Sequence, residues 1–262
     1  METTRQGAAV NARGIGVKGP RGWAFRGVDI TADPGSLVAV QGPSGSGRTC
    51  LLLALTGRMR LAEGSATVAG FPLPKRMGTV RGRTALAHVP GVAELEPALT
   101  VGEHLQEQAL LGRRGMPLWG RRRKEAIRAL VDAALTTAGL DPDTLPKGLR
   151  TCVRDLERLE ALRVSVALAA MHQPHLLAVD DLDMKLTPEE RTAAWQLLRD
   201  VALAGTTVVA VASDAPVDAL VVSTAPAAAT ATPTARPATP DTHQPEIHEE
   251  EAAHAFAETG RA

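Results

Sequence analysis

Short apolar runs alternate with longer amphipathic stretches along most of this chain. Three such runs are bounded by Pro, Asp or Gly, which is typical of buried strands in a parallel sheet, at residues 36–41, 175–179 and 206–212. After the first run, residues 49–57 place Leu51, Leu52 and Leu55 at helical spacing. The alternation predicts an α/β domain built around a parallel sheet.

Further helices are expected between these runs. Residues 188–203 have helical periodicity, with Thr187 as the expected N-cap and Pro188 at the first helical position. Between residues 99 and 171 no strand pattern occurs. This block instead predicts three helices, at residues 101–111, 118–138 and 153–171. We therefore expect it to form an all-helical subdomain inserted into the sheet.

The composition changes abruptly after Val222. Residues 223–245 consist mostly of Ala, Thr and Pro, and such a segment buries too little apolar surface to offset the entropy of ordering. The acidic, Ala-rich residues that follow are long enough only for a helix that is marginal in water. The sequence thus predicts an N-terminal arm at 1–9, a folded domain at 10–222 and a disordered tail at 223–262.

Composition and charge narrow the classes of function. The chain has 262 residues, of which 44% are apolar, and this is enough for a substantial core. Its 29 Lys and Arg balance 29 Asp and Glu, and aromatic residues make up only 2%, so nucleic acid is not an expected partner. No run reaches the roughly 18 consecutive apolar residues of a membrane span, and no signal-peptide pattern is visible, so we expect a cytoplasmic location.

A Gly-rich segment joins the first apolar run to the helix after it. It consists of Gly42, Pro43, Ser44, Gly45, Ser46, Gly47, Arg48 and Thr49. A phosphate-binding loop requires this context of strand, loop and helix, because glycines let backbone N–H groups point at phosphate oxygens beside a helix N-terminus. Thr49 then offers its hydroxyl to Mg²⁺. A plain Gly/Ser turn is the alternative, and it leaves the combination of three glycines, a cation and a Thr to coincidence.

Arg48 stands where such loops carry Lys. Lysine delivers a compact charge between the β- and γ-phosphates, whereas the larger planar guanidinium prefers a bidentate grip. We expect the exchange to impair catalysis more than binding.

Two carboxylates, Asp180 and Asp181, follow the second apolar run. Asp180 is expected to hold Mg²⁺ through water, and Asp181 to lie next to the γ-phosphate, where a carboxylate orients or deprotonates the attacking water. Acidic residues also commonly end strands, so the pair alone decides nothing. With the phosphate loop upstream we favour the metal site.

From about Val10 to Val222 the chain resembles the ATP-binding subunits of ABC transporters. The resemblance is carried by Asp33-Pro34-Gly35, the loop at 42–49, and the pattern Val164 to Ala170, Pro174 and Leu176 to Asp181. It implies a P-loop NTPase cassette, with a mainly parallel sheet, an N-terminal antiparallel β part and an inserted helical subdomain. It also implies that ATP and Mg²⁺ are bound between two cassettes, in a homodimer or a heterodimer. Such a pair drives an integral membrane transporter subunit at the inner face of the cell membrane.

The chain departs from this family at its signature motif. The segment that corresponds to the family's Leu-Ser-Gly-Gly-Gln consists of Leu156, Glu157, Arg158, Leu159 and Glu160. In the family, the Ser hydroxyl, the Gly amides and a helix N-terminus receive the γ-phosphate bound by the opposite subunit. Glu157 brings like charge toward that phosphate. No other Ser-Gly-Gly occurs between residues 99 and 180, so a shifted alignment does not recover the motif.

Other departures affect the same expected site. Gly91 follows a Val-Pro pair where the family has Gln, and Ser213 stands in place of the switch His. Asp181 is one methylene shorter than the family's catalytic Glu, which makes it a weak candidate for the base. The stacking aromatic expected near residues 17–19 is absent, and Trp23 is the nearby alternative.

These observations support a cassette that binds Mg-ATP with weak or lost hydrolysis and docks to a separate membrane subunit. The alternative is a regulatory or scaffolding protein on the same fold that no longer binds nucleotide. A small P-loop kinase is disfavoured, because its lid and its acceptor-binding arginines cannot be placed.

A basic cluster lies within the expected helical subdomain, at Arg113, Arg114, Arg121, Arg122, Arg123 and Lys124. A solvated helix face is the simplest interpretation, and a patch beside anionic lipid headgroups is the alternative.

Overall fold

The computed structural model describes residues 7–111 and 121–225 of the chain. The strands are β1 (Val10–Gly19), β2 (Gly22–Ala32), β3 (Leu37–Gln41), β4 (Glu63–Val68), β5 (Phe71–Leu73), β6 (Thr84–Leu86), β7 (Leu176–Val179), β8 (Thr207–Val211) and β9 (Leu220–Ser223). The helices are α1 (Arg48–Leu55), α2 (Met77–Arg81), α3 (Val101–Leu111), α4 (Arg121–Thr137), α5 (Arg158–Ala170) and α6 (Pro188–Leu203). Three short 3-10 helices lie at Pro142–Thr144, Gly148–Arg150 and Val153–Asp155.

A parallel sheet of five strands forms the centre of the described part, in the order β6-β7-β8-β3-β9. Every residue of β7 and β8 is buried, which explains why both strands are continuous apolar runs in the sequence. Successive side chains of a strand point to opposite faces of the sheet, so the sheet contributes to two separate cores. In β3, for example, Val38 packs on one face and Ala39 on the other.

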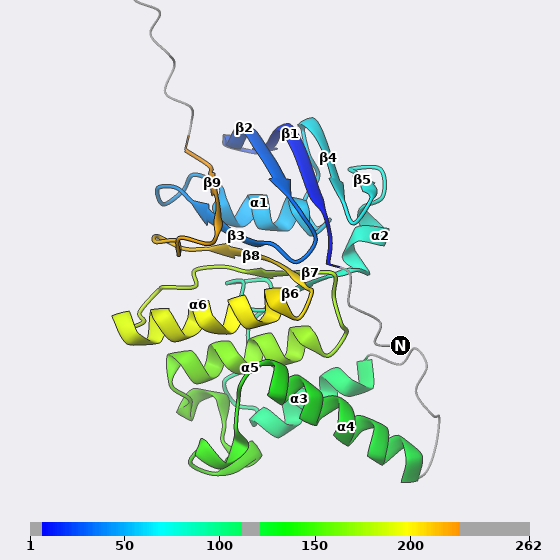
Figure 1. Cartoon of the computed structure of the whole chain (residues 1–262), viewed down its shortest axis with the longest axis vertical. Helices are drawn as coiled ribbons and strands as arrows, with labels where there is room; N and C mark the ends of the chain where they lie inside the picture. Colours follow the sequence, from blue (N-terminus) through cyan, green and yellow to red (C-terminus); the bar gives the residue numbers. More distant parts are fainter. Residues whose placement is uncertain (1–6, 112–120, 226–262) are drawn as a thin grey trace, which may run out of the picture. The chain divides into compact units, whose positions relative to one another are not determined.

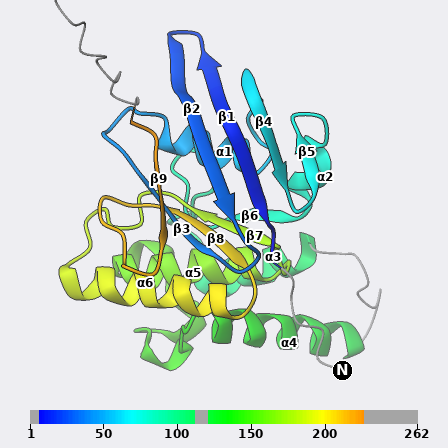
Figure 2. The same ribbon diagram turned by 45° about the horizontal axis from the view of Figure 1, so that its top comes forward.

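The N-terminal part adds a second, antiparallel sheet in the order β2-β1-β4-β5. Helix α1 lies between the two sheets, and Leu51, Leu52 and Leu55 of this helix belong to the core that they share (Figure 1). Helices α3, α4, α5 and α6 cover the opposite face of the parallel sheet, as both views show (Figure 2). The predicted α/β fold, with its antiparallel N-terminal part and its helical insertion between β6 and β7, is confirmed.

The ends of α6 follow the sequence pattern closely. Thr187 accepts a hydrogen bond from the Glu190 amide at 3.2 Å, and the Glu190 carboxylate accepts one from the Thr187 amide at 2.7 Å. This reciprocal pair stabilises the first turn, which Pro188 begins. The predicted N-cap is therefore confirmed.

The last helix of the insertion starts later than its periodicity suggests. Residues 153–155 form a 3-10 turn, and α5 begins at Arg158 because Glu157 and Glu160 make a capping box there. Near the end of the described chain, Leu220–Ser223 pairs in parallel with β3 as an edge strand, which the sequence pattern did not predict.

Two predictions fall wholly or partly outside the described residues. These are the tail predicted at 223–262, of which residues 226–262 lie outside, and the basic cluster, of which Arg113 and Arg114 lie outside. The other four residues of the cluster, from Arg121 to Lys124, form the first turn of α4. Among the helices of the described ranges, none combines the length and the apolar character that crossing a bilayer requires.

Candidate functional site

The Gly-rich segment lies between the end of β3 and the start of α1, at the carboxyl edge of the parallel sheet. Gly47 is the N-cap of α1 and adopts φ 83°, and a Cβ built there would lie 2.4 Å from the carbonyl oxygen of Ala24 in β2. Only glycine fits this position without displacing the backbone. The loop therefore approaches the antiparallel sheet closely and leads directly into a helix N-terminus.

A contact between two hydroxyl groups holds the loop against the residue that follows β9. Ser46 Oγ lies 2.6 Å from Thr224 Oγ1, and the amide of Ser46 donates to the carbonyl of Pro43 at 3.1 Å. Thr224 is itself bound to the carbonyl of Gln41 through its amide at 3.0 Å. Pro43, Ser44 and Gly45 form the exposed tip. Thr224 was not predicted as part of the site, because it follows the composition change that predicted a tail.

Thr49 and Asp180 come together at the base of the loop. Thr49 Oγ1 donates a hydrogen bond to Asp180 Oδ2 at 2.5 Å. Asp180 directly follows β7, is 1% exposed, and donates its amide to the carbonyl of His88 at 2.7 Å. Burial raises the pKa of Asp180 above its ordinary value, and the charge of Asp181 adds to this effect. Hydrogen bonds from Thr49 and from the Asp181 amide oppose the rise in pKa.

This pair of oxygen groups suits a magnesium ion. Hydroxyl and carboxylate oxygens are hard ligands, and Mg²⁺ commonly keeps several waters beside one or two protein oxygens and the phosphates of its substrate. Within residues 7–111 and 121–225, no cluster of three or more His, Cys, Asp or Glu side chains has the geometry of a metal site. The two oxygens at Thr49 and Asp180 thus fit a phosphate-bound Mg²⁺ rather than an ion held by protein alone.

Arg48 and Asp181 face each other beside that pair. Arg48 Nη2 lies 4.0 Å from Asp181 Oδ1, and the two side chains are 20% and 25% exposed. Asp181 adopts φ 45°, and its amide donates to Asp180 Oδ1 at 3.0 Å. This turn holds the Asp181 carboxylate next to the guanidinium that stands at the end of the phosphate loop.

A small cavity of about 40 Å³ borders Asp181, His88 and Arg158. The volume is sufficient for one or two water molecules. Burial lowers the pKa of His88 below its ordinary value, and the charge of Arg158 lowers it further, so His88 is neutral at pH 7. A neutral imidazole, a carboxylate and a guanidinium therefore surround this space.

The sequence that forms this site matches the model of one protein family. The model of the ABC transporter family matches residues 25–183, more than half of the chain, including the whole Gly-rich loop and both aspartates. The chain belongs to the ABC transporter family. Its fold is that of the P-loop ATP-binding cassettes.

Relatives and solved structures agree with this assignment. The Nod factor export ATP-binding protein I of Cupriavidus metallidurans is 29% identical over 69% of this chain and 55% of its own length. The cell division ATP-binding protein FtsE of Streptococcus pneumoniae is 27% identical over 71% of this chain and 76% of its own. The chain thus spans little more than half the length of the first of these relatives.

Two solved cassettes share the fold. cbiO1 from Clostridium perfringens, part of the ABC transporter complex cbiONQ, superposes with a TM-score of 0.64 at 19% identity over 79% of each chain. A dimeric bacterial ABC transporter cassette superposes with a TM-score of 0.63 at 21% identity, over 78% of this chain and 88% of its own.

In this cassette, the segment at the signature position caps its own helix. The Glu160 carboxylate accepts a hydrogen bond from the amide of Glu157 at 2.8 Å, and the two glutamates form a capping box at the start of the helix. Two carboxylates therefore occupy the N-terminus of α5, and Glu160 lies in its first turn, where it interacts favourably with the helix dipole. Local sequence rules did not reveal this box, because Ser, Thr, Asp or Asn is the usual N-cap.

Two further residues that differ from the family pattern, Ser213 and Gly91, are held by hydrogen bonds to neighbouring groups. Ser213 follows β8, where its amide donates to Asp183 Oδ2 at 2.7 Å and its carbonyl accepts from Gln41 Nε2 at 2.9 Å. Gly91 donates its amide to Glu94 Oε1 at 2.9 Å in the loop after β6. Gln41 thus connects the end of β3 to the segment after β8.

Trp23 lies opposite Lys18 in the pairing of β1 with β2 and is 42% exposed. The guanidinium of Arg26 lies 4.7 Å from the centre of its ring, and the Lys18 ammonium lies 5.9 Å away. The residue after it, Ala24, is the one that the phosphate loop approaches at Gly47. The ring is therefore held on the hairpin next to the loop, with cations on the aromatic surface.

Proposed function

We propose that this chain is the ATP-binding subunit of an ABC-type transporter, which binds Mg-ATP and couples binding to a separate membrane subunit. The observation that carries the proposal is the 2.5 Å contact between Thr49 and Asp180 at the base of the Gly-rich loop. It supports a magnesium position at the start of α1, beside the Gly-rich loop. The cassette that we propose spans residues 10–222.

Each group of the site has a distinct role in this proposal. The backbone amides of residues 42–49 bind phosphate oxygens, and the N-terminus of α1 adds its dipole. Arg48 supplies the positive charge, while Thr49 and Asp180 hold Mg²⁺, directly and through water. The ion supplies charge neutralisation on the phosphate oxygens when it is bound.

We further propose that hydrolysis is weak or lost. Asp181, the candidate base, is one methylene shorter than the family's Glu and lies 4.0 Å from Arg48. Ser213 carries no imidazole where the family has His. The Glu160 carboxylate binds the amide of Glu157 at the start of α5, where the family presents amides to the opposite subunit's phosphate. Because these groups act together in catalysis, the effect on the rate of losing several of them is not the sum of the effects of losing each one.

The proposed partners are an integral membrane subunit and a second cassette, of the same or another chain, at the inner face of the cell membrane. The names of the relatives support this, since one is an export ATP-binding protein and one solved cassette belongs to a transporter complex. Another solved cassette is dimeric.

A regulatory or scaffolding protein without nucleotide binding is the second candidate. It is favoured by the proximity of Arg48 to Asp181, since a carboxylate beside the guanidinium weakens the attraction of that guanidinium for phosphate.

Calorimetric titration with ATP and Mg²⁺, followed by a phosphate-release assay, separates these candidates. We expect saturable binding, loss of that binding in Arg48→Ala, and a turnover below about 0.1 per second, far under the median of about 10 per second for enzymes. Arg60→Ala, which removes an exposed arginine outside the loop, is the matched control and leaves binding unchanged. Absence of binding favours the scaffold, and rapid turnover that Arg48→Ala abolishes contradicts weak hydrolysis.

A further inference from the structure

The edge strand β9 brings a buried threonine against the phosphate loop. β9 pairs in parallel with β3, and this pairing ends where Gln41 lies opposite Ser223. The residues that follow are Gly42, which begins the loop, and Thr224, which is 3% exposed. The end of β9 therefore places a buried hydroxyl group beside the first residue of the loop.

The side chain of Thr224 is fixed by its contacts with β3. Its amide donates a hydrogen bond to the carbonyl of Gln41 at 3.0 Å, and its hydroxyl donates to the same oxygen at 3.3 Å. Because a hydroxyl group has one hydrogen, Thr224 accepts in its contact with Ser46, whose Oγ lies 2.6 Å away. The Gln41 side chain in turn donates to the carbonyl of Ser213 at 2.9 Å. The hydrogen bonds thus run from the loop through Thr224 to the centre of the sheet.

The same pair of hydroxyl groups fills the space next to Gly42. A Cβ built at Gly42 would lie 2.5 Å from Thr224 Oγ1 and 2.6 Å from Ser46 Oγ. The backbone of the loop therefore passes directly against both hydroxyl groups. Because such close packing leaves no free space, a shift of the loop toward Thr224 produces overlap and a shift away breaks the hydrogen bond.

This contact is the side-chain anchor of the loop. Within residues 7–111 and 121–225, it is the one side-chain hydrogen bond that joins residues 42–47 to the rest of the chain. The tip at Pro43, Ser44 and Gly45 is exposed. Without the anchor the tip is attached only through its two ends, so phosphate binding has to order more of the backbone and becomes weaker.

We propose that Thr224 is a positioning residue of the phosphate loop, which holds Ser46 and thereby fixes the loop amides in the arrangement that binds phosphate oxygens. This assignment rests on the proposed nucleotide function. It places the end of the functional cassette after Thr224, beyond residues 10–222 and beyond the residues 25–183 that match the family model. Because Thr224 acts on the loop as a whole, it affects ATP and ADP alike.

The test uses Thr224→Val in the full chain, which removes the hydroxyl group and keeps the shape of the side chain. We expect the dissociation constants of Mg-ATP and of Mg-ADP, measured by calorimetry, both to rise about three- to tenfold, since one hydrogen bond and the order that it imposes are lost. Thr224→Ser keeps the hydroxyl group, and we expect it to restore both constants to within about twofold.

A double-mutant cycle shows whether Thr224 acts through Ser46. We expect Ser46→Ala to weaken nucleotide binding about as much as Thr224→Val does. Ser46→Ala/Thr224→Val is then no weaker than either single variant, because all three lose the same contact.

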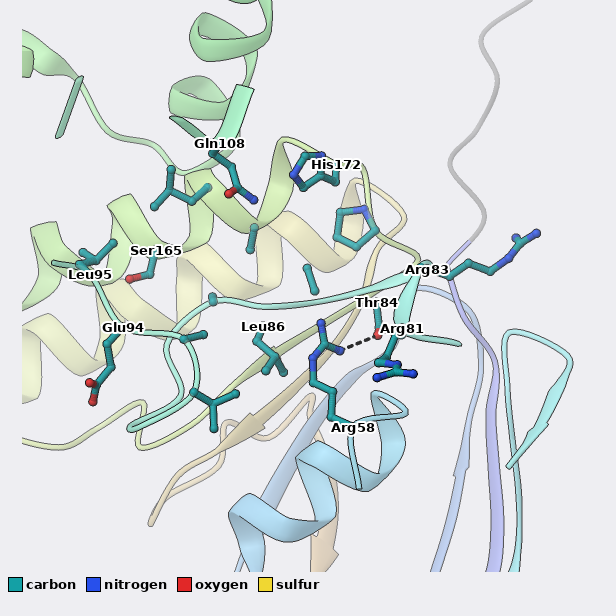
Figure 3. A pocket seen from close by; sticks show the side chains of 18 residues that line it. Arg58, Arg81, Arg83, Thr84, Leu86, Glu94, Leu95, Gln108, Ser165 and His172 are labelled. Atoms are coloured by element: carbon teal, nitrogen blue, oxygen red, sulfur yellow. Dashed lines mark hydrogen bonds between the residues drawn. The ribbon is translucent and has the colours of Figure 1, made fainter. Parts of the chain in front are cut away.

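Thr84 provides the matched control for a general loss of stability. It is 6% exposed, and its hydroxyl donates to the carbonyl of Thr56 and accepts from Arg58 Nη1, both at 3.2 Å. Figure 3 shows the contact with Arg58. Thr84 begins β6 at the amino edge of the parallel sheet, whereas the loop lies at the carboxyl edge. We expect Thr84→Val to lower the melting temperature as Thr224→Val does, and to leave nucleotide affinity unchanged.

Hydrogen exchange of the nucleotide-free chain separates this assignment from the proposed function. We expect the peptide that contains Ser46 and Gly47 to exchange at least threefold faster in Thr224→Val and at the original rate in Thr84→Val. If the unmodified chain binds no nucleotide, the proposed function fails, and the exchange rate alone decides the role of Thr224.

Four results overturn the proposal. The first is unchanged affinity in Thr224→Val, or unchanged exchange where no nucleotide binds. The others are a Thr224→Ser variant that binds as weakly as Thr224→Val, additive losses in the double variant, and an equal loss of affinity in Thr84→Val.

Discussion

The hydroxyl of Thr49 and the carboxylate of Asp180 are joined by a hydrogen bond of 2.5 Å, although they are 131 residues apart in the chain. Thr49 lies in the first turn of α1 after β3, and Asp180 directly follows β7. The strands β3, β8 and β7 are neighbours in a parallel sheet, so their carboxyl ends meet at one edge. This edge is where ligands bind in open α/β sheets.

Replacement of Asp180 by Asn is expected to stabilise the ligand-free protein at pH 7. The folded-state pKa of Asp180 is raised above its ordinary value of 3.8, so between these two values the folded state holds more protons than the unfolded state. The free energy of unfolding therefore falls as the pH rises through that window. Asp180→Asn removes this loss, and its urea midpoint exceeds that of the unmodified protein at pH 7 but not at pH 3.

The same variant is expected to bind Mg-ATP about 10- to 100-fold more weakly, as is usual when a group that orients metal ligands is lost. Calorimetry with and without Mg²⁺ measures this effect. Asp132→Asn, on the outer surface of α4, is the control for both experiments. A variant that is less stable than the control at pH 7 would mean that burial does not govern Asp180.

Gly47→Ala is expected to destabilise the protein by about 2–4 kcal/mol. The added Cβ meets the carbonyl oxygen of Ala24 at 2.4 Å, and a φ of 83° is itself unfavourable for Ala. Urea unfolding followed by circular dichroism measures the change.

Gly45 provides a matched comparison at the tip of the same loop. It has a φ of 80°, but a Cβ built there has no heavy atom within 4 Å. Gly45→Ala is therefore expected to cost only the conformational strain, about 1–2 kcal/mol. Equal losses in the two variants would show that the close approach to β2 has no energetic effect.

Asp181→Asn is expected to raise the affinity for ATP about tenfold and to change the affinity for ADP less. Asp181 lies 4.0 Å from Arg48, and removal of its charge frees the guanidinium and takes a negative group away from the expected γ-phosphate. Competition against a fluorescent nucleotide gives both constants.

Arg48→Lys is the companion variant in that experiment. Lysine is the residue that phosphate loops ordinarily carry, and its compact charge reaches between two phosphates. We expect Arg48→Lys to strengthen ATP binding.

Asp183→Asn is the control for Asp181→Asn, because it alters a neighbouring carboxylate that is bound to the Ser213 amide. We expect it to leave the ratio of ATP to ADP affinity unchanged. An unchanged ratio in Asp181→Asn would show that its charge does not act on the phosphate.

Local patterns in the sequence predicted most of the elements that form the site. Periodicity and capping rules work well where a structure depends on neighbours within a few residues. This holds for the glycines before the helix at 48–55, the apolar run that ends at Asp180 and the Thr-Pro start of α6. Helix α5 starts later than the helical periodicity predicted, because a pair of Glu residues caps it in place of the usual N-cap residues.

Contacts between distant segments were decided only by the tertiary structure. The hydroxyl groups of Thr224 and Ser46 are hydrogen-bonded although the residues are 178 apart in the chain, and Arg58 donates a hydrogen bond to Thr84 in β6. These contacts depend on the order of strands in the sheet and on how the helices cover it. A sequence pattern records the preference of each segment for a conformation and for burial, whereas the proximity of side chains follows from the packing of all the segments together, and for that reason the sequence indicated the phosphate loop but not the groups that surround it.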